Sequence, residues 1–456
     1  MTDPQAPPTT ATQAPTMMVT PTLLTAARAI VRGPSLNRTK TAGYDVKPDE
    51  KILLVEKATD DPAVTQALSQ AMRELGARVD VFHVDIEDRP MDYLDEFRGL
   101  MHNIPGVEYD EAFKLWRQRF EWLERAAVEQ DYQLLLQGDA GALPNLDGVR
   151  YEGVPWYHRI TFPAAGFPWP LWDLINTKAW QPIWERGRGA WVELTDPEGS
   201  EIRWRLQEKY FEESHYEGHR RRFRPEYYLG HLFGWPTPPY DDGLECEGVV
   251  AGTLNHFGRP FPHAKAHFKG AKLTHVEGGG EYGDKWRELM ELTKDIQYPE
   301  YPDKGLFWLW ECAIGTQPKM ARPPYAFTLS GHAAMYERLR SGIIHIGIGT
   351  GNANVSEKWA AEQGLPYGHL HIHMQFATYK LHTTDGEEIT VIDNGRLKAL
   401  DDPEVRDLAA EYGDPDELLT EAWTPPIPGI SVPGDYWKDY APDPARWIEE
   451  NDVSQA

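Results

Sequence analysis

The hydrophobic and polar positions near the start of the chain alternate in blocks that predict an α/β unit. Residues 51–56 (KILLVE) form a short apolar run that is typical of a buried parallel strand. Asp61 and Pro62 then supply a cap and an early proline for a helix over residues 63–75. A second strand is predicted at residues 78–84. Strand, helix and strand in this order make a βαβ unit, whose crossover should be right-handed.

Further segments extend this first half. A short helix is predicted over residues 23–31, and residues 109–130 carry an apolar stripe at steps of three and four that predicts a longer helix. Strands are predicted at residues 132–137 and 159–162. We therefore expect residues 21–188 to form an α/β N-terminal domain.

From about residue 189 the pattern changes to short strands separated by turn residues. Residues 190–195 and 201–206 alternate on either side of Asp196-Pro-Glu-Gly199, which predicts a hairpin. The remaining predictions are a helix over residues 284–296 and strands at residues 266–276, 307–314, 343–349, 370–380 and 388–392. We expect an α+β, β-rich catalytic domain over residues 189–425.

The two ends of the chain fit neither pattern. Residues 1–20 are rich in Pro, Thr and Ala and lack the basic and apolar regions of a secretory signal, so we expect a disordered tail. Residues 426–456 combine Pro and Asp with scattered aromatic residues, which favours a C-terminal arm.

Composition narrows the class of protein. Among 456 residues, 46 Lys and Arg face 71 Asp and Glu, a formal charge of −25. A negative surface repels phosphate and anionic lipid, so nucleic acid and membrane surfaces are disfavoured as partners. No apolar run approaches the roughly 20 residues that span a bilayer. Two cysteines, Cys246 and Cys312, exclude a disulfide-rich scaffold, and we expect both to be buried in a cytoplasmic protein.

Histidines are concentrated in one part of the second half. Ten of the 16 lie between His256 and His382. In the segment GHLHIH, His369, His371 and His373 share one face of a predicted strand, because alternate residues of a strand point the same way. Imidazoles placed in this way suit a metal ion. The alternative is a polar strand face that happens to be rich in histidine.

Two apolar segments hold candidates for a further ligand. His345 stands alone in IIHIGIG, where it is either a ligand or a hydrogen-bonded core residue. Glu311 lies inside FWLWECAI, and a carboxylate in such a strand is costly unless it is paired or bound to a cation. Glu247 is a weaker case of the same kind, with Glu245 on the same strand face.

Other residues suggest how a substrate could be held. Trp308 and Trp310 beside Glu311 suit a planar substrate, although aromatic residues at this density are usually core. Arg222 belongs to the one basic run of the chain, RRRFR. It could clamp a substrate carboxylate, or pair with the glutamates that precede it.

The order of these candidates resembles a known family. Residues 310–315 (WECAIG), 344–349 (IHIGIG) and 370–373 (LHIH) are similar to segments of the aminopeptidase T/S metallopeptidases and of their oxygenase relative, 2,5-dihydroxypyridine 5,6-dioxygenase. Residues 46–77 resemble the family's first βαβ unit. The resemblance covers about residues 20–60 and 185–400. It implies an aminopeptidase T-like fold and a homo-oligomer.

Two departures from the family bear on the metal. The family's aspartate ligand is replaced here by His373, and a tyrosine of the peptidases by Asn352, which becomes a candidate for binding substrate. An imidazole cannot bridge two ions as a carboxylate does, which favours one metal over two. The oxygenase relative holds a single iron with two histidines and an aspartate. The resemblance thus implies His345, His371 and His373 as ligands, with Glu311 as a further ligand or base. His369, on the same strand face, is a second candidate for the base.

Three functions follow from these residues. The first is a mononuclear non-haem Fe(II) dioxygenase that uses O₂ to cleave a small hydroxylated aromatic or N-heteroaromatic ring. The second is a Zn²⁺- or Co²⁺-dependent aminopeptidase or related metallohydrolase, in which Glu247 and Glu311 would serve as bridging ligand and base. The third is a metal-stabilised binding protein without turnover.

Overall fold

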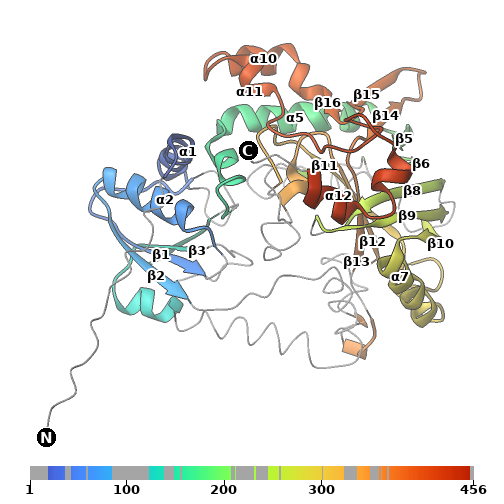
Figure 1. The fold of residues 1–456 in the computed structure, drawn as a ribbon, viewed down its shortest axis with the longest axis horizontal. Helices are drawn as coiled ribbons and strands as arrows, with labels where there is room; N and C mark the ends of the chain where they lie inside the picture. The colour runs from blue at the N-terminus through green and yellow to red at the C-terminus, as the bar shows by residue number, and fades with distance from the viewer. Residues whose placement is uncertain are drawn as a thin grey trace, which may run out of the picture.

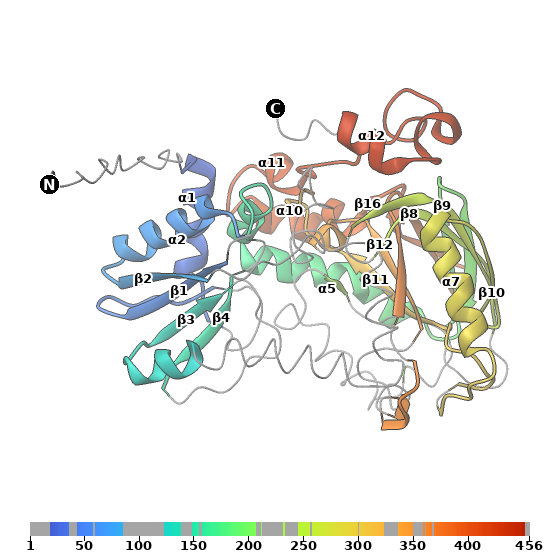
Figure 2. The ribbon, with the colours of Figure 1, turned by 60° about the horizontal axis from the view of Figure 1, so that its bottom comes forward.

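The computed structural model describes residues 19–35, 43–57, 60–84, 123–137, 148–154, 157–206, 211, 231–232, 245–255, 258–299, 301–322, 336–349, 359–360, 362–366 and 369–451. Its fold is mixed α/β and contains a four-stranded parallel sheet, an eight-stranded sheet and a second four-stranded sheet. The parallel sheet lies to one side of the two others (Figures 1 and 2).

The N-terminal half is built on the parallel sheet, with strand order β2-β1-β3-β4. Its strands are β1 (Lys51–Lys57), β2 (Arg78–Val84), β3 (Leu134–Gln137) and β4 (Arg150–Gly153), and its helices are α1 (Pro21–Arg32) and α2 (Pro62–Glu74). The predicted βαβ unit is confirmed, with the side chain of Asp61 accepting a hydrogen bond from Ala63 N as the α2 cap. β4 was not predicted.

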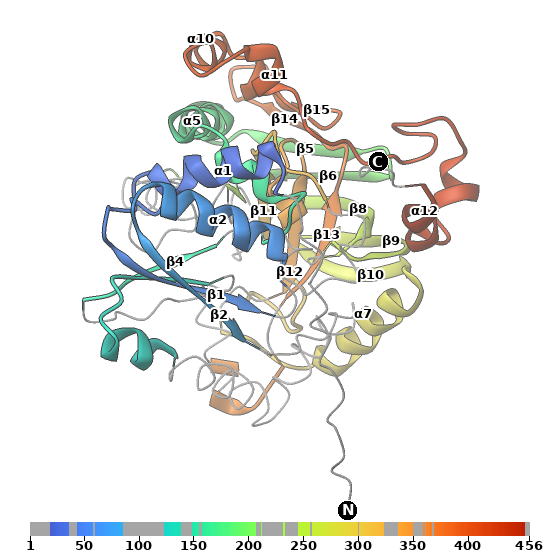
Figure 3. The ribbon, with the colours of Figure 1, turned by 60° about the vertical axis from the view of Figure 1, so that its left-hand side comes forward.

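Both faces of this sheet are covered. Ile52 and Leu54 of β1 face a core shared with α1 and α2, whereas Leu53 and Val55 face a second core with Leu123 and Ala127. The continuous apolar run of β1 thus reflects burial on both faces, as expected for a parallel strand. Figure 3 shows α1 and α2 lying across the sheet.

One predicted strand of this half is absent from the structure, and one predicted helix is described only in part. The strand at residues 159–162 is wrong: this segment is a turn that enters the 3₁₀ helix η1 (Phe162–Gly166). Pro163 suits the start of a helix and cannot donate to a strand ladder, while the Arg159 side chain is held by Asp61 at 2.7 Å. Of the helix predicted over residues 109–130, only the part from residue 123 lies within the described residues, and it is helical.

The second half contains the two other sheets. The eight-stranded sheet has the order β10-β9-β8-β6-β5-β14-β15-β16, and the four-stranded sheet has the order β13-β12-β11-β7. Their strands are β5 (Trp191–Asp196), β6 (Ser200–Arg205), β7 (His231–Leu232), β8 (Cys246–Leu254), β9 (Pro260–Lys269), β10 (Lys272–Gly278), β11 (Leu309–Gly315), β12 (Ile344–Gly349), β13 (His369–Met374), β14 (Thr378–His382), β15 (Glu388–Asp393) and β16 (Arg396–Leu397).

Most strand predictions for this half are confirmed, including the β5–β6 hairpin. The single strand predicted at residues 266–276 is wrong, because Gly270 and Ala271 adopt positive φ values of 60° and 64° and turn the chain between β9 and β10. The strand predicted at residues 370–380 is interrupted between β13 and β14. Periodicity alone does not distinguish two short strands joined by a tight turn from one long strand.

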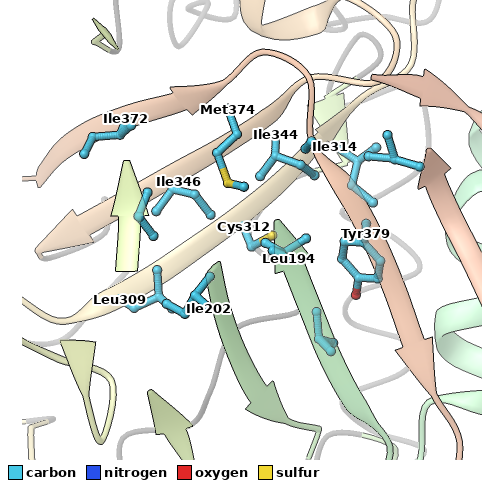
Figure 4. Close-up of a cluster of buried hydrophobic side chains, with 14 of the residues drawn as sticks. Leu194, Ile202, Leu309, Cys312, Ile314, Ile344, Ile346, Ile372, Met374 and Tyr379 are labelled. Carbon is cyan, nitrogen blue, oxygen red and sulfur yellow. The ribbon is translucent and has the colours of Figure 1, made fainter. Parts of the chain in front are cut away.

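The two sheets of this half pack face to face through an apolar layer (Figure 4). Cys312 of β11, Ile346 of β12 and Ile372 of β13 point into this layer, opposite Leu194 and Ile202 of the other sheet. The opposite faces of β11, β12 and β13 are therefore left for other side chains. Cys312 and Cys246 are buried free thiols, as expected.

Helices close the edges of this half. They are α5 (Trp169–Arg186), α7 (Gly280–Thr293), η3 (Tyr336–Leu339), η4 (Lys398–Asp401), α10 (Pro403–Ala409) and α11 (Pro415–Leu419). The buried residues of α5 belong to the same core as the two sheets. In the described part of the chain, no helix has the length and apolar character needed to cross a membrane.

The C-terminal arm has regular structure of its own. It contains a π-helical turn, η5 (Tyr436–Tyr440), and the helix α12 (Pro444–Asn451). Tyr436, Tyr440 and Ile448 pack with Phe376 in a small separate core. The arm lies over the β9 side of the eight-stranded sheet, where Ala441 O accepts a hydrogen bond from His263 N at 2.8 Å.

Candidate metal centre

The register of the four-stranded sheet aligns the candidate residues in two rows. Glu311 of β11 lies opposite Gly347 of β12, which lies opposite His371 of β13. In the next row His345 of β12 lies opposite His373 of β13. All four side chains point away from the apolar layer of Figure 4, because they alternate with residues that fill it.

Glu311, His345 and His371 form a compact buried group. The Oε2 atom of Glu311 lies 3.4 Å from Nε2 of His345 and 3.2 Å from Nε2 of His371. One ligand atom from each of the three residues lies within 4.8 Å of the others. The two imidazole rings are 4.2 Å apart at an angle of 35°. Each side chain is almost completely inaccessible to solvent.

Gly347 makes this convergence possible. It occupies the position between Glu311 and His371, two residues that lie two strands apart. A side chain at Gly347 would stand on the same face, between the carboxylate and the imidazole. Its absence lets the Glu311 carboxyl reach His371 across the middle strand.

His373 occupies a different place from the three other residues. Its Nε2 atom lies 2.7 Å from Nδ1 of His345, on the side of that ring that faces away from Glu311. Burial, together with the charges of Arg338 and Arg340, lowers the pKa of His373 to about 3, so its ring is neutral. A neutral His373 can accept a hydrogen bond from Nδ1–H of His345, and in that tautomer the lone pair of His345 lies on Nε2, toward Glu311.

Burial dominates the electrostatics of the Glu311 carboxyl. Burial raises the pKa of Glu311 to about 8, and the nearby positive charge of Arg338 opposes this only in part. A buried carboxylate with so high a pKa is stabilised in its ionised form by a bound cation. The electrostatics therefore favour a cation beside Glu311.

The donor set fits a transition-metal ion. Two imidazole nitrogens and one carboxylate oxygen are the ligands of non-haem Fe(II) sites with open positions, and also of some catalytic zinc sites. Glu311 is the one carboxylate of this group within the described residues. A single carboxylate favours one ion over a pair of bridged ions.

Tyrosine hydroxyls anchor the strands that carry the group. Tyr282 of α7 donates a hydrogen bond to His371 O at 3.1 Å, and Tyr301 donates one to Gly349 O at 2.6 Å. Both tyrosines are buried. The sequence did not single out either residue, since a buried tyrosine that bonds to backbone has no local pattern.

Two predicted site residues lie elsewhere. Glu247 is exposed on β8 and pairs with Arg203, so it does not join Glu311. Its strand belongs to the eight-stranded sheet, which local sequence could not indicate. Trp308 is buried, donates a hydrogen bond to Gly305 O at 3.1 Å and stacks on the ring of Tyr301 at 5.4 Å. It therefore packs in the core, which was the alternative to contact with a planar substrate.

The remaining predicted residues lie outside what the structure describes. They are Asn352, Arg222 and the side chains of His369 and Trp310. The backbone of His369 pairs with Gly349 at the end of β13. For these four residues, the proposed substrate and base roles stay predictions.

Comparison with known proteins gave a likeness in structure but none in sequence. No protein-family model and no curated protein sequence matches the chain. The structure of 2,5-dihydroxypyridine dioxygenase from Pseudomonas putida is similar with a TM-score of 0.42 and 13% sequence identity, over 82% of this chain and 96% of that chain.

Proposed function

We propose that this protein is a mononuclear metal-dependent dioxygenase, which binds Fe(II) through Glu311, His345 and His371 and cleaves a hydroxylated aromatic or N-heteroaromatic ring. The observation that carries the proposal is the convergence of one carboxylate and two imidazoles in a buried place, with ligand atoms within 4.8 Å of one another. Fe(II) bound by two histidines and a carboxylate supplies the redox chemistry by which O₂ attacks an organic substrate.

The residues of the chain would have separate tasks. Glu311 supplies the negative charge that balances the ion, and burial strengthens that attraction because the surroundings are poorly polarisable. His373 holds the ring of His345 through the 2.7 Å contact, so that Nε2 stays available for the metal. Arg338 and Arg340 add positive charge beside the group, which favours a substrate with an ionised hydroxyl or a carboxylate substituent.

Metal content distinguishes the proposal from hydrolysis and from binding alone. Protein purified without oxygen should carry about one iron per chain and should consume O₂ with some member of a panel of dihydroxylated aromatic and N-heteroaromatic compounds. About two Zn²⁺ or Co²⁺ ions per chain with peptidase activity would contradict the proposal in favour of a hydrolase. One tightly held metal without turnover of any compound would leave a metal-stabilised binding protein.

A pair of matched variants tests the ligand set. Glu311→Gln should lose the metal, because an amide carries no charge to balance the ion. Glu247→Gln should retain it, because Glu247 lies on an exposed strand beside Arg203. Equal metal content in both variants would contradict the assignment of Glu311.

A further inference from the structure

A second group of metal-ligating side chains lies on the β9–β10 hairpin. His267 of β9 and His275 and Glu277 of β10 have ligand atoms within 4.8 Å of one another. β10 is an outermost strand of the eight-stranded sheet, at the right of Figure 1. His275 and Glu277 are more than half exposed, and His267 is about a quarter exposed, so the group is open to ions from solvent.

A β-bulge brings these residues onto one face. Leu273 lies opposite Phe268, but the next pair is His275 with His267, so Thr274 is an extra residue in β10. In a regular ladder Thr274 would lie opposite His267, and His275 would point to the other face. Bulges re-aim side chains in this way beside functional sites. Glu277, two residues further along β10, shares the face of His275.

The Thr274 hydroxyl determines which ring nitrogen of His275 carries the proton. Thr274 Oγ1 donates its single proton to His267 O at 2.9 Å, so its oxygen is an acceptor for Nδ1 of His275 at 3.3 Å. With Nδ1 protonated, a neutral His275 has its lone pair on Nε2. That nitrogen lies 3.4 Å from Oε1 of Glu277. The Nε2 lone pair of this tautomer and the carboxylate oxygen therefore face one place, which either a proton, as in an ion pair, or a metal ion can occupy.

His267 meets the same carboxylate oxygen. Its Nε2 atom lies 3.1 Å from Oε1 of Glu277, yet this nitrogen is buried and makes no hydrogen bond within the described residues. The rings of His267 and His275 stack at 3.9 Å and 11°. Two imidazoles and one carboxylate oxygen therefore converge on one place, with ligand atoms within 4.8 Å of one another.

We propose that His267, His275 and Glu277 bind a divalent transition-metal ion of the Zn²⁺, Ni²⁺ or Cu²⁺ class, with water as the remaining ligands. Imidazole and carboxylate donors suit these ions, and Cu²⁺ should bind most tightly among them. The ion joins β9 to β10 and stabilises the edge of the sheet, since it binds the folded hairpin in preference to the unfolded chain. This site shares no residue with the buried group, so it does not depend on the proposed function.

Zn²⁺ titration calorimetry in a His371→Ala background isolates this site from the buried one. The background protein should bind one Zn²⁺ per chain, and adding His275→Gln or Glu277→Gln should weaken binding at least tenfold. His83→Gln is the matched control: His83 is an exposed histidine paired only with Glu56, at 2.8 Å, among the described residues. It should leave Zn²⁺ binding unchanged. Equal affinities in all four proteins would overturn the proposal.

Copper spectroscopy in the same His371→Ala background gives a second readout, because this background lacks one of the two imidazole ligands of the buried group and leaves the hairpin as the expected site with two nitrogen donors. The number of Cu²⁺ ions bound per chain should fall by one on His275→Gln, while far-UV circular dichroism stays the same. The signal lost should be one that electron paramagnetic resonance assigns to two nitrogen donors. A signal from two nitrogens that survives both His275→Gln and His267→Gln would place the copper elsewhere and contradict the site.

Discussion

The Nδ1 atom of His345 lies 2.7 Å from the Nε2 atom of His373, across the pair of strands β12 and β13. This contact turns His373 away from the group formed by Glu311, His345 and His371. A histidine that binds a metal through one nitrogen commonly donates a hydrogen bond from the other, which fixes its tautomer and orientation. The contact therefore assigns different tasks to two histidines that are adjacent on one strand face, His371 and His373.

We predict that replacing His373 weakens metal binding without abolishing it. His373→Ala should reduce metal affinity about 10- to 100-fold, as is typical for the loss of a hydrogen-bond partner of a ligand. His371→Ala should abolish metal loading, because it removes a ligand. Competition with a chelator measures both affinities. If His373→Ala loses the metal as completely as His371→Ala, His373 is a direct ligand, as the sequence indicated.

A second prediction concerns the gap left by Gly347. Gly347→Val should place a branched side chain between Glu311 and His371 and should prevent metal loading, since the two would no longer converge. Metal content and circular dichroism measured together show whether the site or the fold is lost. The neighbouring substitution Ile348→Val changes the apolar face of the same strand and should cost about 0.5–1.5 kcal/mol of stability with full metal content.

The buried carboxyls of Asp196 and Glu198 predict a dependence of stability on pH. Burial, together with the charge of Asp196, raises the pKa of Glu198 to about 8, although Thr253 and Tyr436 donate hydrogen bonds to it. Burial also raises the pKa of Asp196, to about 6. The folded protein thus keeps protons that the unfolded chain has released. Stability contributed by Glu198 is fully present below about pH 4.5 and declines until about pH 8.

Glu198→Gln should remove this part of the pH dependence. The wild type should lose up to about 1.4 kcal/mol per pH unit relative to the variant across this window. Melting temperatures of both proteins, measured from pH 5 to pH 8, give the comparison. Parallel curves for the two proteins would show that Glu198 ionises normally. Tyr436 belongs to the C-terminal arm, so the same carboxyl also helps to hold the arm on the sheet.

The fourth prediction concerns the cap of α2. Asp61 accepts hydrogen bonds from Ala63 N at 3.0 Å and from the Arg159 side chain at 2.7 Å. Asp61→Ala should cost about 1 kcal/mol for the lost cap, and more for the lost ion pair. Asp61→Asn keeps the cap acceptor and should fall between the wild type and the alanine variant. Melting temperatures measure the order, and equal values for the two variants would contradict a separate contribution from the cap.

Acid should weaken this cap. Burial alone would raise the pKa of Asp61, but the hydrogen bonds from Arg159 and from the backbone lower it below its ordinary value of 3.8. The stabilisation is therefore present above about pH 3.8 and is lost as the pH falls through the lower pKa of the folded state. In Asp61→Asn this acid-dependent loss should disappear.

Local sequence was sufficient for most of the elements that build the site. A continuous apolar run identified β1, an Asp-Pro pair identified the start of α2, and alternation identified the face shared by His371 and His373. The cost of a carboxylate inside an apolar strand pointed to Glu311. These inferences succeed because backbone periodicity and the penalty for burying charge act within a few residues.

Strand order and register required the tertiary structure. Alternation places His371 and His373 on one face, but only the pairing of β12 with β13 sets His373 against His345 and leaves His371 in the row of Glu311. Glu247 shows the same limit, since its strand joins the other sheet and its charge is met by Arg203. The bulge at Thr274, which gathers His267 and His275, also depends on the partner strand.

The sequence by itself determined which residues could serve as ligands: a glutamate too costly to bury alone and histidines on one strand face. The tertiary structure decided which of them meet. Side-chain identity and alternation are properties of a single strand, whereas the 3.2 Å approach of Glu311 to His371 spans three strands and the gap at Gly347. Contacts of that kind arise from the packing of segments far apart in the chain, and no local pattern encodes them.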